Sequence, residues 1–399
     1  MTRWIAGVAL LWGFGTACGT SPAALPVVPD SGAVDAGSDA GVTSSTTALR
    51  NVDVTIIYPL PSPATIDDLI AATDIGRGGA LLAPAAFDGA RVPQLDSRST
   101  LPTDEARLAS LRVVAMRFDP CPGQIVPAPA PCQADLRLVF QSIHADGSAR
   151  DGALHAFYTL TDGDRDRVLG ELRALREEKR ADPPVPLDVH PRLLAEGLRG
   201  AFASRLETMI LTYAGASNLV RITQFRRTAE FPPTWDFALR ERTPGGPWHD
   251  AIIPTTGTNS EVLLTISGGR WDADIRPAVS HADDPTDLFS VPSAERPAAL
   301  SHVARLLNPR IHSSESVDCA SCHVAPDIAI FIRQTGSLEV NDDPQSFRTT
   351  YSLDAVAKDP GDAIGFENIH MISYLGRTLS LASRTVHETA AVLEVVNDH

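Results

Sequence analysis

Several residue types and patterns are scarce or absent in this sequence. Cysteine occurs five times in 399 residues, so each cysteine can be assigned an expected role. Only Lys179 and Lys358 are lysines among 34 basic residues, a skew that is typical of a GC-rich genome and indicates no activity. The chain also has no phosphate-binding loop, no dinucleotide fingerprint after a strand and no G-x-S-x-G elbow, so the enzyme classes that use them are unsupported.

Charge and hydropathy exclude further classes. The formal net charge is −15, which argues against nucleic acid or an anionic lipid surface as a partner. Beyond the N-terminal segment, no stretch offers the roughly 18 consecutive apolar residues of a transmembrane helix. The globular part is therefore expected to lie outside the bilayer.

The N-terminus, MTRWIAGVALLWGFGTACGT, has the pattern of an export signal. Arg3 precedes an apolar run, Trp4 to Trp12, that is too short to span a bilayer. Small residues then lead into Cys18, in an arrangement that resembles a bacterial lipobox. This predicts a signal peptide over residues 1–17 and lipidation of Cys18, with ordinary cleavage near the same place as the alternative.

Residues 18–49 are predicted to be the lipidated cysteine and a disordered tether. The segment holds almost no large apolar residue, so it cannot bury enough surface to fold. In the bacterial lipoproteins that this pattern resembles, an aspartate directly after the lipidated cysteine is associated with retention in the inner membrane. Gly19 stands at that position here, which favours the outer membrane. We therefore expect an exported protein of the cell envelope that is lipid-anchored, faces the periplasm or the surface, and lies where disulfides persist.

The stretch SVDCASCHVA brings two cysteines and a histidine close together in the chain. On a helix, residues at i, i+3 and i+4 share one face. Two thiols can bond to the vinyl groups of one haem while the imidazole binds its iron, and C-x-x-C-H is the c-type haem attachment motif for that reason. The motif predicts one haem c attached at Cys319 and Cys322, with His323 as the proximal iron ligand.

Two other interpretations of this motif are open at the level of sequence. Cys319 and Cys322 can form a disulfide in an oxidising compartment, or they can bind zinc with His312 and His323 completing a tetrahedral set. A thioredoxin-like dithiol would need a strand before the motif, whereas NPRIHSSESVD predicts a loop.

The second axial ligand of the iron has several candidates. Met371 lies in the same C-terminal region and would give a Met/His pair, which raises the reduction potential. His370 or His312 would give a bis-histidine iron instead. His155, within ALHAF, is expected on a strand face and not as a ligand.

Cys121 and Cys132 bracket the proline-rich stretch PGQIVPAPAP. We expect these two cysteines to form a disulfide, because closing so short a loop is worth on the order of 3 kcal/mol in an oxidising compartment. A redox-active pair would have closer spacing and an electropositive helix terminus.

The predicted fold class is α+β, with residues 50–294 as a large mixed domain of unassigned role and residues 295–399 as a small, mainly helical haem-binding region. Acidic residues in DGDRD, at 162–166, favour the start of a helix, and Pro309 ends another. The strand-like segments, for which antiparallel pairing is expected, are NVDVTIIYPL, LRVVAMRFD, DLRLVFQSIH, GALHAFYTL, NLVRITQFRR, TWDFALRER and EVLLTISG. Helical spacing marks DRDRVLGELRALREEKR, HPRLLAEGLRGAFASRLETMILTYAG, AERPAALSHVARLLNP and LSLASRTVHETAAVLEVVNDH.

These segments carry two resemblances. Over about residues 295–399, the order of helix, C-x-x-C-H, long connection and terminal helix is similar to that of small monohaem cytochromes c. The stretches RFDPCPG, PCQADLRLVFQ, ALHAFYTL, DVHPRL and SVDCASCHVA together resemble a family of exported lipoproteins from myxobacteria and related deltaproteobacteria, from about residue 50 to the C-terminus. The second resemblance implies export and a lipid anchor, and it carries no established activity.

The sequence thus predicts an envelope lipoprotein with one covalently bound c-type haem that passes single electrons to or from an unidentified redox partner protein. An electron carrier is favoured over a catalyst, although an enzyme that combines haem with the N-terminal domain is a further alternative. Contact with the membrane is expected through the lipid anchor only, and none with nucleic acid. The alternative from another class is a haem-free surface lipoprotein, stapled by disulfides, with a binding or structural role.

Overall fold

All residues that the structure describes fall within the unit Thr46–His399. The computed structural model describes residues 48–87, 103–120, 133–177, 185–227, 234–254, 257–266, 270–271, 294, 296–314, 316–336, 338–355 and 371–397. Its helices are α1 (Asn51–Val54), α2 (Asp104–Ser110), α3 (Asp162–Glu177), α4 (Pro191–Glu196), α5 (Ala201–Tyr213), α6 (Arg296–Leu307), α7 (Cys319–Gly336) and α8 (Ser383–Asn397).

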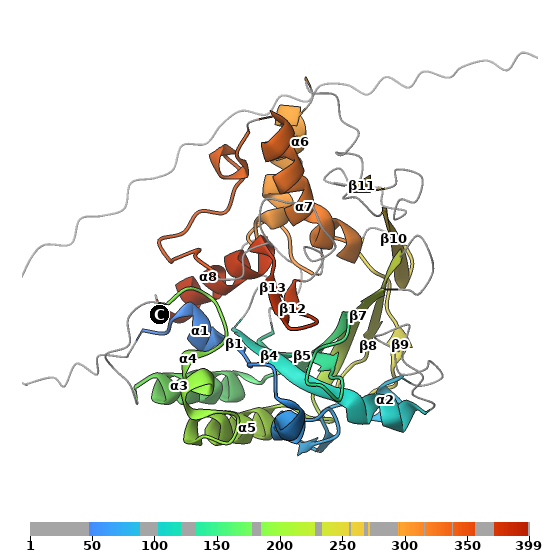
Figure 1. The fold of residues 1–399 in the computed structure, drawn as a ribbon, viewed down its shortest axis with the longest axis vertical. Coiled ribbons are helices and arrows are strands. Elements are labelled where there is room, and N and C mark those ends of the chain that lie inside the picture. The colour runs from blue at the N-terminus through green and yellow to red at the C-terminus, as the bar shows by residue number, and fades with distance from the viewer. Residues whose placement is uncertain are drawn as a thin grey trace, which may run out of the picture. The chain divides into compact units, whose positions relative to one another are not determined.

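A large antiparallel sheet organises this unit, as Figure 1 shows. Its strand order is β1-β4-β5-β6-β7-β8-β10-β11, with β9 paired to β8, and the small hairpins β2-β3 and β12-β13 stand apart from it. The strands are β1 (Thr55–Ile57), β2 (Ile75–Gly76), β3 (Gly79–Ala80), β4 (Leu111–Asp119), β5 (Asp135–Ser142), β6 (Gly152–Thr159), β7 (Leu219–Arg227), β8 (Thr234–Glu241), β9 (His249–Asp250), β10 (Ser260–Ile266), β11 (Arg270–Trp271), β12 (Ile372–Leu375) and β13 (Thr378–Leu381). The predicted mixture of helices with an antiparallel sheet is confirmed.

Alternation along the central strands gives the sheet two different faces. On β5, Leu136, Leu138 and Phe140 are fully buried and share one face, while Arg137 and Val139 project from the other. Figure 1 shows α3 and α5 beside one face of the sheet, and α7 and α8 beside the other. The apolar face is covered by the first pair of helices, and the mixed face is covered by the C-terminal region.

Local signals explain the start of one helix and the end of another. Helix α3 begins at Asp162 with two acidic residues in its first turn, as DGDRD predicts, because carboxylates are favourable at a helix N-terminus. Helix α6 ends at Leu307, two residues before Pro309, as expected from the clash of proline with a continuing helix.

Two segments differ from the sequence-based expectation. NVDVTIIYPL starts with the helical turn α1 instead of a strand, because the Asp53 carboxylate accepts a hydrogen bond from the backbone N–H of Arg50 at 2.8 Å and closes the turn. The long helical stretch from His190 is divided into α4 and α5. Gly197 ends α4 with a φ of 75°, which glycine adopts without strain.

The C-terminal region is less helical than predicted because β12 and β13 form a hairpin, and part of it lies in a stretch expected to be helical. Gly376, with a φ of 63°, supplies the tight turn between the strands. The hairpin binds the sheet through Gln141 on β5, whose side chain accepts from the Tyr374 N–H at 2.7 Å and donates to the Tyr374 carbonyl at 2.9 Å. This region is therefore part of the same packed body as the sheet.

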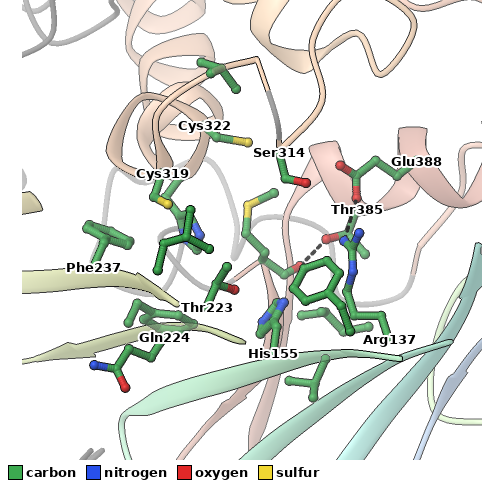
Figure 2. Close-up of a pocket in the computed structure, with 18 of the residues that line it drawn as sticks. Arg137, His155, Thr223, Gln224, Phe237, Ser314, Cys319, Cys322, Thr385 and Glu388 are labelled. Carbon is green, nitrogen blue, oxygen red and sulfur yellow. Dashed lines mark hydrogen bonds and ion pairs between the residues drawn. The ribbon is translucent and has the colours of Figure 1, made fainter. Parts of the chain in front are cut away.

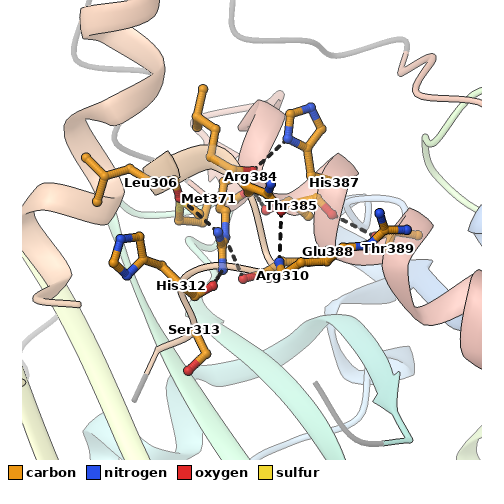
Figure 3. A network of polar contacts seen from close by, with 12 residues as sticks. Leu306, Arg310, His312, Ser313, Met371, Arg384, Thr385, His387, Glu388 and Thr389 are labelled. Atoms are coloured by element: carbon orange, nitrogen blue, oxygen red, sulfur yellow. Dashed lines mark hydrogen bonds and ion pairs between the residues drawn. The ribbon is translucent and has the colours of Figure 1, made fainter. Parts of the chain in front are cut away.

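Arg384 on α8 joins the C-terminal helices to the sheet, and Figure 3 shows its contacts. The side chain is 1% exposed, and its guanidinium donates to the carbonyls of Leu306, at 2.8 Å, and of His312. It also donates to the Glu388 carboxylate at 2.9 Å, and Glu388 in turn pairs with Arg117 on β4. One arginine thus satisfies carbonyls at the end of α6 and in the loop before α7, and it is linked through Glu388 to the sheet.

His387, also on α8, contacts the same end of α6. Burial lowers the pKa of His387 to about 4, so its ring is neutral near pH 7. A neutral ring can donate from Nδ1 to the Leu307 carbonyl, which lies 2.7 Å away. Helices α6 and α8 are therefore joined by two adjacent polar contacts.

Within the residues that the structure covers, none of the helices is both long enough and apolar enough to cross a membrane.

Replacing Arg384 with methionine should lower the free energy of unfolding by about 3 to 5 kcal/mol, because it removes one of the cations paired with Glu388 and leaves two buried carbonyls without their donor. Urea denaturation followed by circular dichroism measures this change. The matched control is Arg205→Met on the exposed side of α5, which should change the free energy by less than about 0.5 kcal/mol. Equal midpoints for the two variants would show that the Arg384 contacts are dispensable.

Candidate functional site

The C-x-x-C-H motif forms the first turns of α7. The buried side chain of Asp318 precedes the helix, and its carboxylate accepts a hydrogen bond from the Ser321 N–H at 2.7 Å, which is the bond of an N-cap aspartate. The cap starts the helix at Cys319. Because Cys319, Cys322 and His323 occupy positions i, i+3 and i+4, they project from one face of it.

That helix face borders a pocket between α7 and the mixed face of the sheet. Cys319, Cys322 and His323 all line it. Figure 2 shows both cysteines on the helix side of the pocket, across from His155 and Phe237 on the strands. The spacing in the sequence and the packing of the fold thus bring the three motif side chains to one space.

His323 packs against aromatic side chains of the sheet. Its ring centroid lies 4.9 Å from that of Phe237 on β8 and 5.3 Å from that of Phe225 on β7, with interplanar angles of 56° in both cases. Such tilted contacts are favourable for aromatic rings and restrict the orientation of the imidazole.

Cross-strand rows of side chains form the sheet side of the pocket. Val139, His155, Thr223 and Leu239 are successive partners across β5, β6, β7 and β8, and all four line the pocket. This row supplies apolar surface at both ends and one imidazole near its middle. Because the row lies on central strands, its residues are held by hydrogen-bonded neighbours on both sides.

The next row makes one end of the pocket charged. Arg117 on β4 and Arg137 on β5 are register partners, and both approach Glu388 on α8, Arg137 at 3.9 Å. Burial by itself would raise the pKa of Glu388, but the guanidinium groups of Arg117, Arg384 and Arg137 outweigh it and hold this pKa well below its usual value. Glu388 is therefore ionised. The Nε atoms of Arg117 and Arg137 are buried and have no hydrogen-bond partner in the structure.

His155 faces this charged end from β6. Its Nε2 atom is buried and has no hydrogen-bond partner in the structure. Burial, together with the positive charge of Arg137 nearby, lowers the pKa of His155 well below its ordinary value. The imidazole is therefore neutral near pH 7.

The wall formed by the C-terminal segment contains Met371, Ile372 and Thr385. Met371 is buried, and its carbonyl accepts hydrogen bonds from the Ala382 N–H at 3.0 Å and from the Thr385 hydroxyl. The backbone at Met371 is thus held by the start of α8, while its side chain contributes to the pocket.

The structure brings four of the predicted site residues together, namely Cys319, Cys322, His323 and Met371. His312 is buried but does not line the pocket, and its Nδ1 lies 3.4 Å from the Ser316 hydroxyl. The remaining predicted site residues, Cys18, Cys121, Cys132 and His370, lie outside the described residues.

The arrangement can be compared with the three interpretations of the motif. Cys319 and Cys322 are thiols, and no disulfide forms among the residues that the structure covers. Within the same residues, no group of three or more His, Cys, Asp or Glu side chains is placed to hold a metal ion, so the zinc set with His312 is not assembled. A c-type haem makes no such demand, because only His323 of the motif would contact the iron while the thiols bond to carbon.

The donor set and the surroundings fit a haem in their chemistry. The pocket offers two thiols, an imidazole, aromatic and aliphatic walls, and two arginines with unused N–H groups. The space enclosed between these walls is about 90 Å³, and the pocket would have to widen to hold a porphyrin.

Sequence reasoning missed Arg117, Arg137, His155 and Glu388 as pocket residues. Their pattern could have been noticed, because RLVF, HAFY and MRFD place Arg137, His155 and Arg117 at alternate positions between buried apolar residues. Alternation indicates which residues share a strand face, but it does not tell which helix will cover that face.

Comparisons of the chain with family models, with curated proteins and with solved structures find no match.

The thiol of Cys322 should react slowly with iodoacetamide in protein made without haem attachment. Burial raises the pKa of this thiol from 9.0 to about 11, so at pH 8 its thiolate fraction and its alkylation rate should fall by about 100-fold relative to the unfolded chain. Peptide mass spectrometry of timed reactions, with and without urea, measures the ratio. Equal rates in the two conditions would contradict the raised pKa of this thiol.

Proposed function

We propose that this protein is an envelope lipoprotein that carries one covalently bound haem c and transfers single electrons. Cys319 and Cys322 would hold the porphyrin through thioether bonds, and His323 would bind the iron. The observation that carries the proposal is that all three motif side chains line one pocket, on the first turns of a capped helix.

The other walls of the pocket support the same assignment. Phe225 and Phe237 contact the His323 ring and would hold the imidazole in one orientation toward the iron. Val139 and Leu239 add apolar surface, which excludes water and favours a porphyrin face. The free Nε–H groups at the charged end are donors for carboxylates, such as the two propionates of a haem.

A haem c supplies one-electron chemistry, since its iron alternates between the ferric and ferrous states. The chain's own residues would set the conditions for that change. Met371 lines the same pocket and is the methionine candidate for the second axial ligand. Apolar packing around His323 limits access of water to the site, and the redox partner would be another protein.

We propose a likeness to monohaem cytochromes c only in the order of the elements along the chain. Helix α6, the motif on α7, a long connection and the terminal helix α8 follow one another in that order, and α7 contacts both α6 and α8. In a small cytochrome c such helices would enclose the haem by themselves, whereas here the sheet forms the opposite wall. The N-terminal body would thus be part of the haem pocket.

Covalent haem is tested by a pyridine haemochrome spectrum of denatured, solvent-extracted protein from a host that attaches haem c. We expect a c-type spectrum and a mass increase of one haem, both lost in Cys319→Ser/Cys322→Ser, because no thioether bond can form. His323→Ala should remove the native haem spectrum, because the iron loses its proximal ligand.

The matched control is His302→Ala on α6, which leaves the motif intact and should keep the wild-type spectrum. A wild-type protein without haem, beside a control cytochrome that matures in the same cells, would overturn the proposal. A mass four hydrogens below that of the fully reduced chain, as two disulfides would give, would then support the haem-free, disulfide-stapled lipoprotein.

We further propose that Cys18 carries the lipid and anchors the protein in the outer membrane. Support comes from the sequence alone, through the short apolar run, the lipobox-like approach to Cys18 and the polar tether that follows it.

Replacing Cys18 with serine should move the protein from the membrane fraction to the periplasmic or culture fraction, because the lipid-bearing thiol is lost. Detergent phase partitioning and the mass of the N-terminal peptide measure this change. A Cys18→Ser protein that still sediments with outer membranes would show that the attachment has another origin.

A further inference from the structure

His155 occupies the part of the pocket that faces the motif helix. It lies on β6, a central strand, where its register partners are Val139 on β5 and Thr223 on β7. Figure 2 shows His155 on the sheet side of the pocket, with Cys319 and Cys322 on the side of α7. The imidazole and the motif therefore approach one space from opposite walls.

The Nε2 atom of His155 is buried and has no hydrogen-bond partner. Buried polar atoms almost always have a partner, since leaving one unpaired is unfavourable, and each exception requires an explanation. The strand holds this residue between two hydrogen-bonded neighbours, so the side chain cannot leave the pocket without disturbing the sheet. A metal ion that accepts the Nε2 lone pair would give this atom a partner without any movement of the side chain.

Met371 has no corresponding need for a ligand. A thioether is a weak acceptor that behaves as an apolar, gap-filling side chain, so its burial is explained by packing alone. The polar contacts at this residue are made by its backbone carbonyl, which accepts from Ala382 and Thr385. The buried groups in the pocket therefore favour the imidazole over the thioether as a metal ligand.

The other histidine candidate within the described residues is placed less well. His312 is not part of the pocket lining, and its Nδ1 lies 3.4 Å from the Ser316 hydroxyl. Its backbone carbonyl is also held by Arg384, which keeps the loop close to α8. A role as ligand would require this loop to rearrange, whereas His155 already lines the pocket.

We propose that Nε2 of His155 is the second axial ligand of the haem iron, opposite His323, and that Met371 is a packing residue of the pocket wall. This inference rests on the proposed haem at Cys319 and Cys322. It makes the iron bis-histidine and six-coordinate, with a lower reduction potential than a Met/His pair would give. With both axial positions filled by the chain, the site is suited to electron transfer and not to reactions that need an open iron position.

The test uses haem-loaded protein and begins with the extraction-resistant haemochrome spectrum of every variant. If the wild type carries no covalent haem, the proposed function fails. If haem is present, electron paramagnetic resonance and near-infrared magnetic circular dichroism of the ferric protein identify the axial pair. We expect bis-imidazole signatures and no methionine-to-iron band in the wild type, and no binding of carbon monoxide by the ferrous form.

Three variants assign the second imidazole. His155→Ala should lose the bis-imidazole signature, bind carbon monoxide, and recover the wild-type spectrum when imidazole is added. His155→Met retains a ligand and should show the methionine band and a raised reduction potential. Met371→Leu should leave the spectra unchanged, as should the matched control His249→Ala, whose histidine is exposed on β9.

Opposite results overturn the inference while the haem assignment stands. A methionine band in the wild type that Met371→Leu removes would assign Met371 as the ligand. A bis-imidazole signature that survives in His155→Ala would assign another histidine, either His312 or His370. If His155→Ala does not accumulate, the wild-type, His155→Met and Met371→Leu spectra decide the question by themselves.

Discussion

The arrangement of the whole pocket depends on the buried chain of charges Arg384, Glu388 and Arg117. Arg384 holds the end of α6 and the loop before α7, and Glu388 is shared between Arg384 and the sheet. Buried ion pairs contribute little net stability compared with apolar packing, because desolvation offsets most of the attraction. Removing one member is nevertheless strongly unfavourable. The chain of charges therefore favours one relative placement of helix and sheet over alternatives.

That placement produces a pocket with two electrostatic halves. One half is aromatic and aliphatic, around His323, Phe225 and Phe237. The other half contains two guanidinium groups that share one ionised carboxylate, next to a neutral imidazole. A planar ligand with an apolar body and carboxylates at one edge is complementary to such a division. The proposed haem has this shape and charge distribution.

The central sheet has two functions that its strand alternation keeps separate. One face carries Leu136, Leu138 and Phe140 and packs into the core, which makes the strands rigid. The opposite face presents Arg137 and Val139 to the pocket. A wall built on central strands of a packed sheet can hold a ligand-binding side chain more precisely than a loop can. The proposed role of His155 depends on this rigidity.

Local chemistry in the sequence was sufficient for most of the elements and for the motif. The i, i+3, i+4 spacing placed Cys319, Cys322 and His323 on one face, and Pro309 marked a helix end, because both effects act within a few residues. Antiparallel strands were likewise recognisable from β-branched residues. The break at Gly197 was missed because helical spacing continues through that stretch. The hairpin around Gly376 was missed because the stretch with helical spacing begins at Leu379, within β13.

Only the tertiary structure decided what surrounds the motif. Arg117 and Glu388 are separated by 271 positions, and nothing in the sequence of either segment indicates that these two residues form a pair. The same holds for His155, which strand periodicity places on a face without showing that α7 covers it. Periodicity reports how a residue lies within its own element. Which elements meet is determined by packing and charge pairing across the whole core, and those depend on all the segments at once.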